Sequence, residues 1–432
     1  MKQYDLIIIG GGPGGYVAAI RAAQLGACVA LIEKDKVGGT CLNHGCIPTK
    51  AILACTNLFN KIKKAENFGI TASDPSIDLA KVVARKNQLV EKITKGVEFL
   101  LQKNGVEVIY GTGQVIEPGK VEIQKVDSSK QIVESRKIIL ATGSSPTKLP
   151  GIEFDGHHFL SSRQALQLTK IPAEITIVGG GVIGLEFATI FNSLGSQVTI
   201  YEALPEILAG VDEEIVALIK RVFKRKNITV LTNSKFDPAK ATEKNLICIG
   251  RAPNREGLAG LKVNERLETT LPGIYAVGDL VSSQMLAHVA YEQGIIAAEN
   301  ALGAKKTFSY DFIPATIFTE PEVGTVGLTE KEAKAKLGQI KVGKFPFAAL
   351  GIAQAKGDIE GFIKVIADSS NKLLGVHILG PDATNLIGAA TIAVKNGIKA
   401  DQLAETLQAH PSYPEGLHEA ALATLARSLH GI

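Results

Sequence analysis

Two copies of one glycine pattern constrain the fold of this chain more than any other feature of its sequence. In each copy an apolar run leads into Gly-x-Gly-x-x-Gly, and the glycines are Gly10, Gly12 and Gly15 in the first copy and Gly179, Gly181 and Gly184 in the second. The next apolar run ends in an acid, Glu33 or Glu202, 18 residues after the third glycine in both copies. This strand, turn, helix and strand context is typical of dinucleotide binding. The sequence therefore predicts an α/β chain with two Rossmann-like domains.

The second acid also indicates which nucleotide the second domain binds. An acid at the end of this strand pairs with a ribose 2′-hydroxyl and repels a 2′-phosphate. Glu202 therefore predicts NAD rather than NADP. Two such domains fit one tightly held cofactor and one exchanging cofactor.

Residues 38–50 read Gly-Gly-Thr-Cys-Leu-Asn-His-Gly-Cys-Ile-Pro-Thr-Lys and place Cys41 and Cys46 five positions apart. An extended chain would separate their Cα atoms by roughly 16 Å, and a regular α-helix would separate them by about 8.6 Å. A disulfide needs less than about 7 Å, so the two can bridge only across a distorted backbone. Asn43 and Gly45 tolerate unusual dihedral angles. A strained and accessible disulfide of this kind would be readily reduced.

Zinc is the alternative ligand for two nearby cysteines. A four-residue gap without a second cysteine pair is a poor match to zinc-ligand spacing, and we expect no metal. The chain has five cysteines, an odd and sparse set that fits a reducing compartment with one catalytic pair. Cys28 and Cys248 lie in apolar strand patterns and are expected in the core. Cys55 is expected to be a packed residue of a helix.

The composition argues against nucleic-acid and membrane partners. The net charge is +4, and the basic residues are scattered. Apolar runs long enough to span a bilayer are interrupted by glycines. The chain starts on an apolar strand without a basic leader, so we expect no signal peptide and a cytoplasmic location.

Residues 38–50 resemble the active disulfide of the flavin disulfide reductases, and within that family they are most similar to the dihydrolipoamide dehydrogenases. The resemblance covers nearly the whole chain. It implies an FAD-dependent enzyme that oxidises protein-bound dihydrolipoamide and passes hydride to NAD+. It also implies a homodimer that serves the lipoyl domains of a 2-oxo acid dehydrogenase or glycine-cleavage complex. The alternatives are another flavin disulfide reductase, of the glutathione or mercuric reductase kind, and a flavin-binding assembly subunit with impaired turnover.

The resemblance assigns cofactor residues to both nucleotide domains. On the FAD side it implies Gly10, Gly12, Gly15, Glu33, Lys50, Gly113, Ala141, Thr142, Gly143, Asp279, Met285, Leu286, Ala287 and His288. On the NAD side it implies Gly179, Gly181, Gly184, Glu186, Glu202 and Gly250. Lys50 would pair with Glu186, expected in the first turn of the second glycine helix, beside the flavin. Gly250 and Arg251 would line the nicotinamide side, although Ala252 stands where the family usually has a second arginine.

The sequence His410-Pro-Ser-Tyr-Pro-Glu415 is the second chemical motif. Two prolines fix a rigid, non-helical turn that could hold Glu415 against His410 and orient the imidazole as a general base. The motif resembles the family's His-Pro-Thr…Glu element, with Ser412 in place of the threonine. By that resemblance His410 would serve the disulfide of the other subunit, Cys41 would exchange with substrate, and Cys46 would lie nearer the flavin.

The predicted order of domains follows from these motifs. The FAD-binding domain is expected at 1–145 and resumes at 273–308, the NAD-binding domain at 146–272, and an α+β dimerisation domain at 309–432. Similar enzymes place a three-stranded meander before the strand that leads to Gly250, and this needs about 20 residues or more. Here only Thr232–Asn245 intervene, with one large apolar residue, Phe236. We therefore expect a loop or one ragged turn, an exposed sheet face, and a raised KM for NAD+.

Overall fold

The computed structural model describes residues 3–258 and 260–431, and the chain folds as two compact units. The first unit comprises Met1–Gly156, Leu160–Lys170 and Ile249–Ser309. The second comprises His157–Phe159, Ile171–Cys248 and Tyr310–Ile432. The second unit thus contains both the second nucleotide sheet and the C-terminal sheet.

The first unit is built on a seven-stranded sheet in the order β3-β2-β1-β6-β5-β4, with β14 paired to β6. Its strands are β1 (Gln3–Ile9), β2 (Val29–Glu33), β3 (Glu107–Tyr110), β4 (Thr112–Glu117), β5 (Lys120–Gln124), β6 (Lys130–Leu140) and β14 (Ile274–Ala276). β1, β2, β3, β6 and β14 run parallel, and β4 and β5 form an antiparallel meander. A parallel strand is covered on both faces and therefore reads as a continuous apolar run, as in β2, where every residue is buried.

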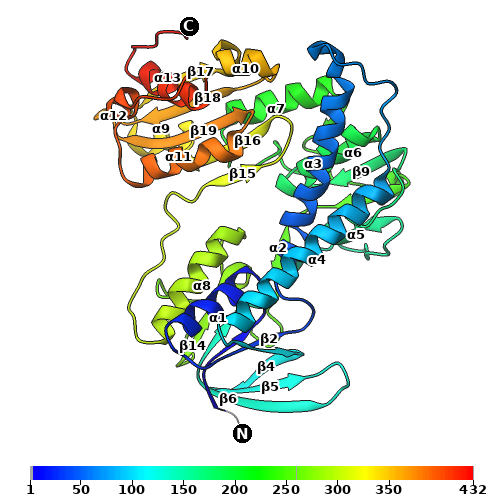
Figure 1. Cartoon of the computed structure of the whole chain (residues 1–432), viewed down its shortest axis with the longest axis vertical. Coiled ribbons are helices and arrows are strands. Elements are labelled where there is room, and N and C mark those ends of the chain that lie inside the picture. Colours follow the sequence, from blue (N-terminus) through cyan, green and yellow to red (C-terminus); the bar gives the residue numbers. More distant parts are fainter. Residues whose placement is uncertain (1–2, 259, 432) are drawn as a thin grey trace. The chain divides into compact units, whose positions relative to one another are not determined.

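Helices cover this sheet and carry the redox segment. They are α1 (Pro13–Gln24), α2 (Gly39–His44), α3 (Cys46–Lys63), η1 (Ala65–Phe68), α4 (Leu79–Lys103), α5 (Ser162–Ala165), η3 (Gly278–Leu280) and α8 (Ala287–Ala301). Two short strands, β7 (Ser144–Pro146) and β13 (Arg251–Pro253), pair antiparallel. Helices α1 and α8 lie side by side (Figure 1). Their contact requires glycine, because a Cβ on Gly294 would lie 2.3 Å from the carbonyl oxygen of Gly14.

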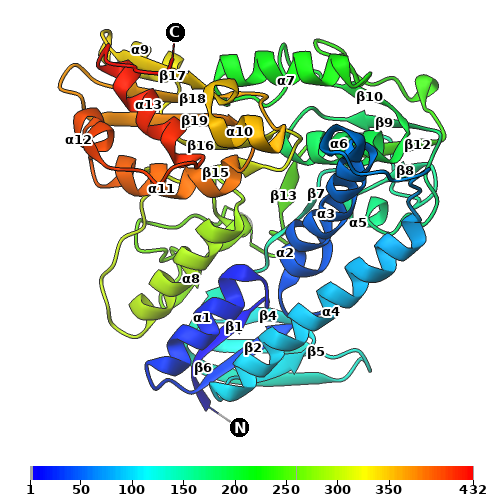
Figure 2. The ribbon, with the colours of Figure 1, turned by 45° about the horizontal axis from the view of Figure 1, so that its top comes forward.

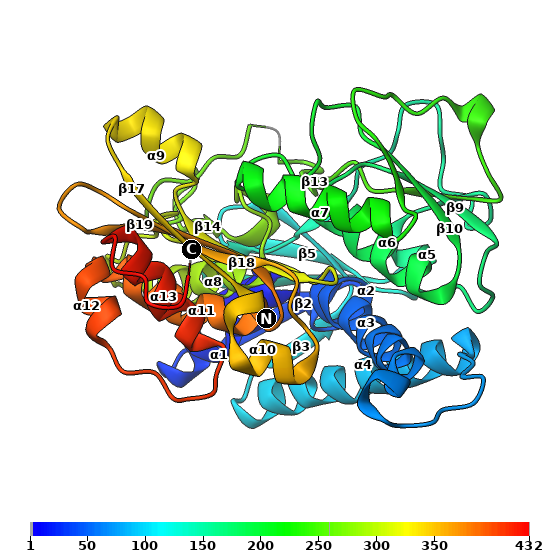
Figure 3. The same ribbon diagram turned by 90° about the horizontal axis from the view of Figure 1, so that it is seen from above.

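The second nucleotide sheet has five strands in the order β11-β10-β9-β12-β8. They are β8 (Phe159–Leu160), β9 (Glu174–Val178), β10 (Gln197–Tyr201), β11 (Thr229–Leu231) and β12 (Lys244–Ile247). Helices α6 (Val182–Leu194) and α7 (Glu213–Arg225) connect successive parallel strands and lie on one side of the sheet (Figure 3). The connection from β11 to β12 holds a single 3-10 turn, η2 (Pro238–Lys240), as the sequence predicts for this short segment.

The C-terminal sheet is antiparallel, in the order β15-β16-β19-β18-β17 (Figure 2). Its strands are β15 (Ala315–Ile317), β16 (Glu322–Gly327), β17 (Lys341–Pro346), β18 (Phe362–Ala367) and β19 (Leu373–Gly380), and its helices are α9 (Glu330–Leu337), η4 (Phe347–Ala349), α10 (Gly351–Lys356), α11 (Ala383–Lys395), α12 (Ala400–Glu405) and α13 (Pro414–Thr424). Helices α11 and α13 pack on one face through Gly324 and Gly343, where a Cβ would lie 2.5 Å and 2.1 Å from their carbonyl oxygens.

Two expectations about burial are wrong. Cys28 is exposed rather than buried, because it precedes β2 instead of lying in it. The face of the second nucleotide sheet opposite α6 is not exposed: Thr176, Val178 and Ile247 on it are at most 5 % accessible. Cys248 is buried as expected. Within residues 3–258 and 260–431, no helix combines the length and the apolar character needed to cross a bilayer.

Candidate active site

The two cysteines lie on either side of a break between two helices. Cys41 is on α2 and Cys46 is the first residue of α3. Gly45 between them has φ −143° and ψ −103°, which interrupts the helical path. This distortion brings the two thiols together, and they form a hydrogen bond. The expectation of a distorted backbone between the two cysteines is confirmed, and the distortion lies at Gly45 and not at Asn43.

The thiol of Cys41 holds its proton strongly in this geometry. The hydrogen bond to Cys46 raises the pKa of Cys41, and burial raises it further, while the nearby Lys50 acts in the opposite direction. Cys46 is the more exposed of the two.

Asn43 fixes the short helix α2 through its side chain rather than through unusual dihedral angles. Its amide donates to the carbonyl oxygens of Val37 and Gly39, both at 3.0 Å. The hydroxyl of Thr94 on α4 donates to its Oδ1 at 3.2 Å. Since Asn43 is 8 % accessible, these bonds satisfy a buried amide and tie α2 to the rest of the first unit.

The glycine turn of the first unit fits the phosphates of a dinucleotide. A Cβ on Gly10 would lie 2.2 Å from the carbonyl oxygen of Ala141, and one on Gly15 would lie 1.7 Å from that of Gly10. The strand and helix therefore approach as closely as glycine allows. Gly12 is the N-cap of α1, so the amino end of that helix points its N–H groups at the turn, as an anion site requires.

Glu33 and Glu202 are held by the same bonds in the two copies. Glu33 Oε2 accepts from the amide of Gly11 at 2.6 Å, and Oε1 accepts from that of Asp35 at 2.8 Å. Glu202 accepts in the same way from two backbone amides, one in the glycine turn and one two residues later, both at 2.7 Å. Each carboxylate is thus fixed beside its glycine turn before a ribose arrives. The repeat seen in the sequence is confirmed at the level of single hydrogen bonds.

A polar network surrounds Asp279, one of the residues expected to bind FAD. Ser144 Oγ donates to Asp279 Oδ2 at 2.5 Å. Arg251 Nε donates to Ser144 Oγ at 2.7 Å, and Nη2 donates to the Ser144 carbonyl at 2.6 Å and to Thr40 Oγ1 at 3.4 Å. Burial lowers the pKa of Arg251, while Asp279 and Cys46 favour its charge. Sequence reasoning placed Arg251 on the nicotinamide side and missed Ser144, because β7 and β13 meet only in the fold.

The other residues expected to bind FAD lie in the first unit. Ala141, Thr142 and Gly143 follow β6, Met285 and Leu286 precede α8, and Ala287 and His288 begin it. A Cβ on Gly143 would meet open space, whereas one on Gly113 would press on Ile9 and Ile32 at 3.2 Å and 3.1 Å. Gly143 therefore leaves room for a ligand, and Gly113 serves close packing of β4.

The second glycine turn repeats the first. A Cβ on Gly184 would lie 2.1 Å from the carbonyl oxygen of Gly179, and Gly181 is the N-cap of α6. Glu186 is in the second turn of α6, not the first as expected, because the helix begins at Val182. It is 4 % accessible and accepts from the amide of Phe318 at 3.1 Å. Its pairing with Lys50, and the roles of Gly179 and Gly250, stay predictions.

The short segment after β11 covers the sheet that a meander would otherwise cover. The ring of Phe236 packs edge-on against Tyr201, with centroids 5.5 Å apart. Thr242 Oγ1 lies 3.1 Å from Thr176 Oγ1, and Asn245 exchanges hydrogen bonds with the backbone of Thr242. The polar side chains of Thr176 and Asn245 on the sheet therefore find hydrogen-bond partners within the short segment that follows β11. Sequence reasoning could not anticipate this cover, because it depends on pairs far apart in the chain.

We expect Phe236→Ala to loosen this cover. Tyr201 precedes Glu202, so loss of the ring should disturb the ribose site. An aromatic pair contributes ~0.5–1.5 kcal/mol, which sets a rise of roughly twofold to tenfold in the apparent KM for NAD+. Steady-state kinetics at fixed FAD content measures it, with Lys235→Ala as the neighbouring control. An unchanged KM would show that the ring has no part in NAD+ binding.

His410 and Glu415 form the expected pair. His410 Nδ1 lies 2.7 Å from Glu415 Oε1, and the amide of Ser412 donates to Oε2 at 2.7 Å. Burial raises the pKa of Glu415, but the bonds from His410 and Ser412 outweigh it and hold the pKa below its usual range. Tyr413 anchors the turn, since its ring packs edge-on against Phe347 at 5.9 Å. The imidazole itself is largely exposed.

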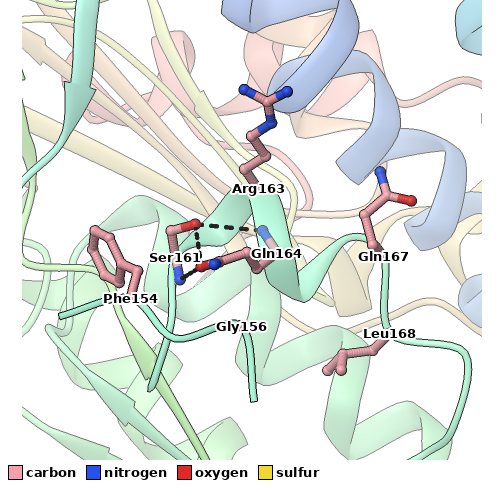
Figure 4. Close-up of a pocket in the computed structure, with 7 residues that line it drawn as sticks. All are labelled: Phe154, Gly156, Ser161, Arg163, Gln164, Gln167 and Leu168. Atoms are coloured by element: carbon pink, nitrogen blue, oxygen red, sulfur yellow. Dashed lines mark hydrogen bonds between the residues drawn. The ribbon is translucent and has the colours of Figure 1, made fainter. Parts of the chain in front are cut away.

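A cavity of about 450 Å³ lies beside α5 in the first unit (Figure 4). It is lined by Phe154, Gly156, Ser161, Arg163, Gln164, Gln167 and Leu168. Ser161 and Gln164 bond each other in a capping box, so their polar groups serve the helix end. In Figure 4 the guanidinium of Arg163 points away from Ser161 and Gln164, and it lies 3.7 Å from Asp35. The described residues also hold no cluster of three or more His, Cys, Asp or Glu suited to a metal.

Comparison with known families decides the identity of the fold. The family model "Pyridine nucleotide-disulphide oxidoreductase" matches residues 4–294, and the dimerisation domain of the same family matches residues 313–421. The chain belongs to the pyridine nucleotide-disulphide oxidoreductases.

Curated relatives match this oxidoreductase over nearly its whole length. It is 39 % identical to a dihydrolipoyl dehydrogenase of Bacillus subtilis, covering 98 % of this chain and 99 % of that protein. It is 40 % identical to one of Thermus scotoductus, covering 100 % and 99 %. These alignments span 456 and 465 positions against 432 residues here. Both relatives therefore contain residues without a counterpart in this oxidoreductase, as a shortened segment requires.

Solved structures share the architecture of this oxidoreductase. LpdA from Mycobacterium tuberculosis has a TM-score of 0.89 at 28 % identity, covering 98 % of this chain and 99 % of that chain. The flavoprotein disulfide reductase RclA from Escherichia coli, solved as a Cu(II) complex, has a TM-score of 0.87 at 26 % identity, covering 98 % and 99 %. The predicted α/β fold class, with two dinucleotide-binding domains and a C-terminal dimerisation domain, is confirmed.

Proposed function

We propose that this oxidoreductase is a dihydrolipoamide dehydrogenase that uses FAD and NAD+. The observation that carries the proposal is the pair Cys41 and Cys46, which meet across the break at Gly45 in the unit whose glycine turn fits a dinucleotide. The support from relatives is that full-length matches at 39–40 % identity bear this activity in their names.

We infer the chemistry of the thiols from two residue pairs, Cys41 with Cys46 and His410 with Glu415. In the oxidised enzyme Cys41 and Cys46 would form a disulfide. His410, oriented by Glu415, takes a proton from a substrate thiol. The sulfur of that thiol attacks Cys41 and breaks the disulfide bond to Cys46. Cys46 leaves as a thiolate, and attack by the second substrate thiol on the mixed disulfide releases the oxidised product and the Cys41 thiol. When bound, FAD would supply the two-electron transfer between the thiols of Cys41 and Cys46 and NAD+. FAD would be held by Asp279, by Glu33 and by the glycines of the first turn, Gly10, Gly12 and Gly15.

The alternatives differ in nucleotide and substrate. A glutathione reductase would use NADPH, which Glu202 opposes, and an assembly subunit would bind flavin without turnover. The deciding experiment compares NAD+-dependent oxidation of dihydrolipoamide with NADPH-dependent reduction of glutathione disulfide. We expect only the first reaction. Turnover of glutathione disulfide alone would refute the proposal, and absence of both activities in a flavin-loaded protein would favour the assembly role.

We expect Glu202 to exclude NADP. Its carboxylate is held beside the glycine turn and would face the 2′-phosphate, at a cost of several kcal/mol. Glu202→Gln should weaken NAD+ binding. It should also lower the ratio of kcat/KM for NAD+ to kcat/KM for NADP+ at least tenfold. The measurement is kcat/KM for both nucleotides, with Glu206→Gln as control. Equal use of NAD+ and NADP+ by the parent enzyme would contradict this assignment.

The dimerisation domain makes the protein a homodimer of the family type. Its proposed partners are the lipoyl domains of a 2-oxo acid dehydrogenase or glycine-cleavage complex, and its proposed location is cytoplasmic. We further propose FAD binding by residues 1–145 and 273–308, NAD binding by 146–272, and subunit contact by 309–432.

A further inference from the structure

Helix α7 of the nucleotide lobe is bonded at its amino end to the C-terminal sheet of the same unit. Lys364 on β18 is 1 % accessible. Its Nζ lies 3.0 Å from both carboxylate oxygens of Asp212, the N-cap of α7. It also lies 2.7 Å from Glu214 Oε2 and 2.6 Å from Glu330 Oε2. Neighbouring residues Ile363 and Val365 are in the core that includes α11 and α13, so strand alternation directs Lys364 to the other face of the sheet.

One buried lysine therefore meets three carboxylates that come from two other elements. Glu330 begins α9, and Asp212 and Glu214 are at the start of α7, so both helix dipoles favour the acids. Bonds from Lys334 and Lys364 hold the pKa of Glu330 at about 2. Burial opposes the charge of Lys364, but the three acids keep its pKa above the usual value. The lysine is thus the common counter-ion of the cluster, and its removal would leave buried charge unpaired.

The carboxyl end of α7 is bonded to the same part of the chain. Lys226 Nζ lies 2.9 Å from both the carbonyl oxygen and Oε2 of Glu320. Arg225 forms an ion pair with Glu360. Acids lie at the amino end and bases at the carboxyl end of α7, and each end has a partner of opposite charge in residues 310–432. One helix is therefore fixed at two points about 20 Å apart, from its length of 13 residues.

We propose that Lys364 is a positioning residue that clamps the NAD lobe to the C-terminal domain through α7, and that NAD+ affinity depends on this clamp. The inference rests on the proposed use of NAD+. Helix α7 is bonded at both ends to residues 310–432, and we expect these bonds to hold it rigid. Lys364 acts on the nucleotide through Asp212 and α7, which leads into the sheet that bears Glu202.

The test compares Lys364→Met with Lys331→Met in the FAD-loaded enzyme. Lys331 forms an ion pair with Glu213 on the same helix, but both side chains are more than 70 % accessible. We expect Lys364→Met to speed amide hydrogen exchange in α7 and to weaken NAD+ binding by calorimetry about fivefold, ~1 kcal/mol. Anaerobic bleaching of the flavin by dihydrolipoamide should be unchanged. Lys331→Met should leave all three measurements as in the parent.

A second variant keeps the test decisive if Lys364→Met does not fold. The double substitution Arg225→Met with Lys226→Met removes the partly exposed end of the clamp, and we expect faster exchange in α7 and weaker NAD+ binding. Unchanged exchange and affinity in whichever variants fold would overturn the inference, as would equal effects from Lys331→Met. Failure of dihydrolipoamide to bleach the flavin of the parent enzyme would instead refute the proposed function. Amide hydrogen exchange in α7 and NAD+ affinity would still test whether Lys364 clamps the lobe.

Discussion

Cys41→Ser and Cys46→Ser are each expected to lose lipoamide turnover by at least a thousandfold while FAD stays bound. Exchange requires two sulfurs, because one forms the mixed disulfide and the other must leave. Serine is close to cysteine in size. The substitution leaves unchanged the glycine turn and Asp279, which are proposed to hold FAD. The loss should therefore fall on chemistry and not on cofactor content.

The measurements are steady-state oxidation of dihydrolipoamide and the flavin-to-protein absorbance ratio. Cys55→Ser is the matched control, since Cys55 lies on the same helix α3 as Cys46, and it should retain activity. Substantial turnover in either active-site variant would contradict the disulfide mechanism.

His410→Gln is expected to lower turnover by ~10²–10⁴, the range for a lost general base. Glutamine keeps one hydrogen-bonding group near Glu415 but cannot take a proton at neutral pH.

The depressed pKa of Glu415 means that its carboxylate is charged in the folded protein above that lowered value. Stability from this bond is therefore complete above the unfolded pKa of ~4.3 and is lost as pH falls through the folded pKa. The activity of the parent should fall on acidification, and Glu415→Gln should remove that part of the profile.

Mixing two inactive variants tests whether His410 serves the other subunit. In a twofold dimer with random exchange, Cys41→Ser mixed with His410→Gln should restore about a quarter of the sites if the histidine acts in trans. Each variant mixed with itself is the control. No recovery after proven subunit exchange would place His410 and Cys41 of one chain in the same site.

The short cover of the nucleotide lobe shows where pattern and fold differ. The sequence correctly predicts a loop or a single turn in place of a meander, and the structure has one 3-10 turn there. The inference of an exposed sheet face fails, because Phe236 and Thr242 reach Tyr201 and Thr176 across the fold. Strand periodicity gives the face on which a residue lies, but it does not say which distant side chain will cover that face.

The sequence by itself determined both nucleotide units, the cysteine pair on a distorted backbone, and the pairing of His410 with Glu415. Each depends on residues close in the chain, so spacing and backbone preference suffice. Tertiary structure alone decided the Arg251–Ser144–Asp279 network and the burial of Lys364 among three acids. These groups come from separate strands and helices, and in isolation each would be an ordinary polar or charged group of the surface. Only the packing that removes water from them makes their pairing necessary.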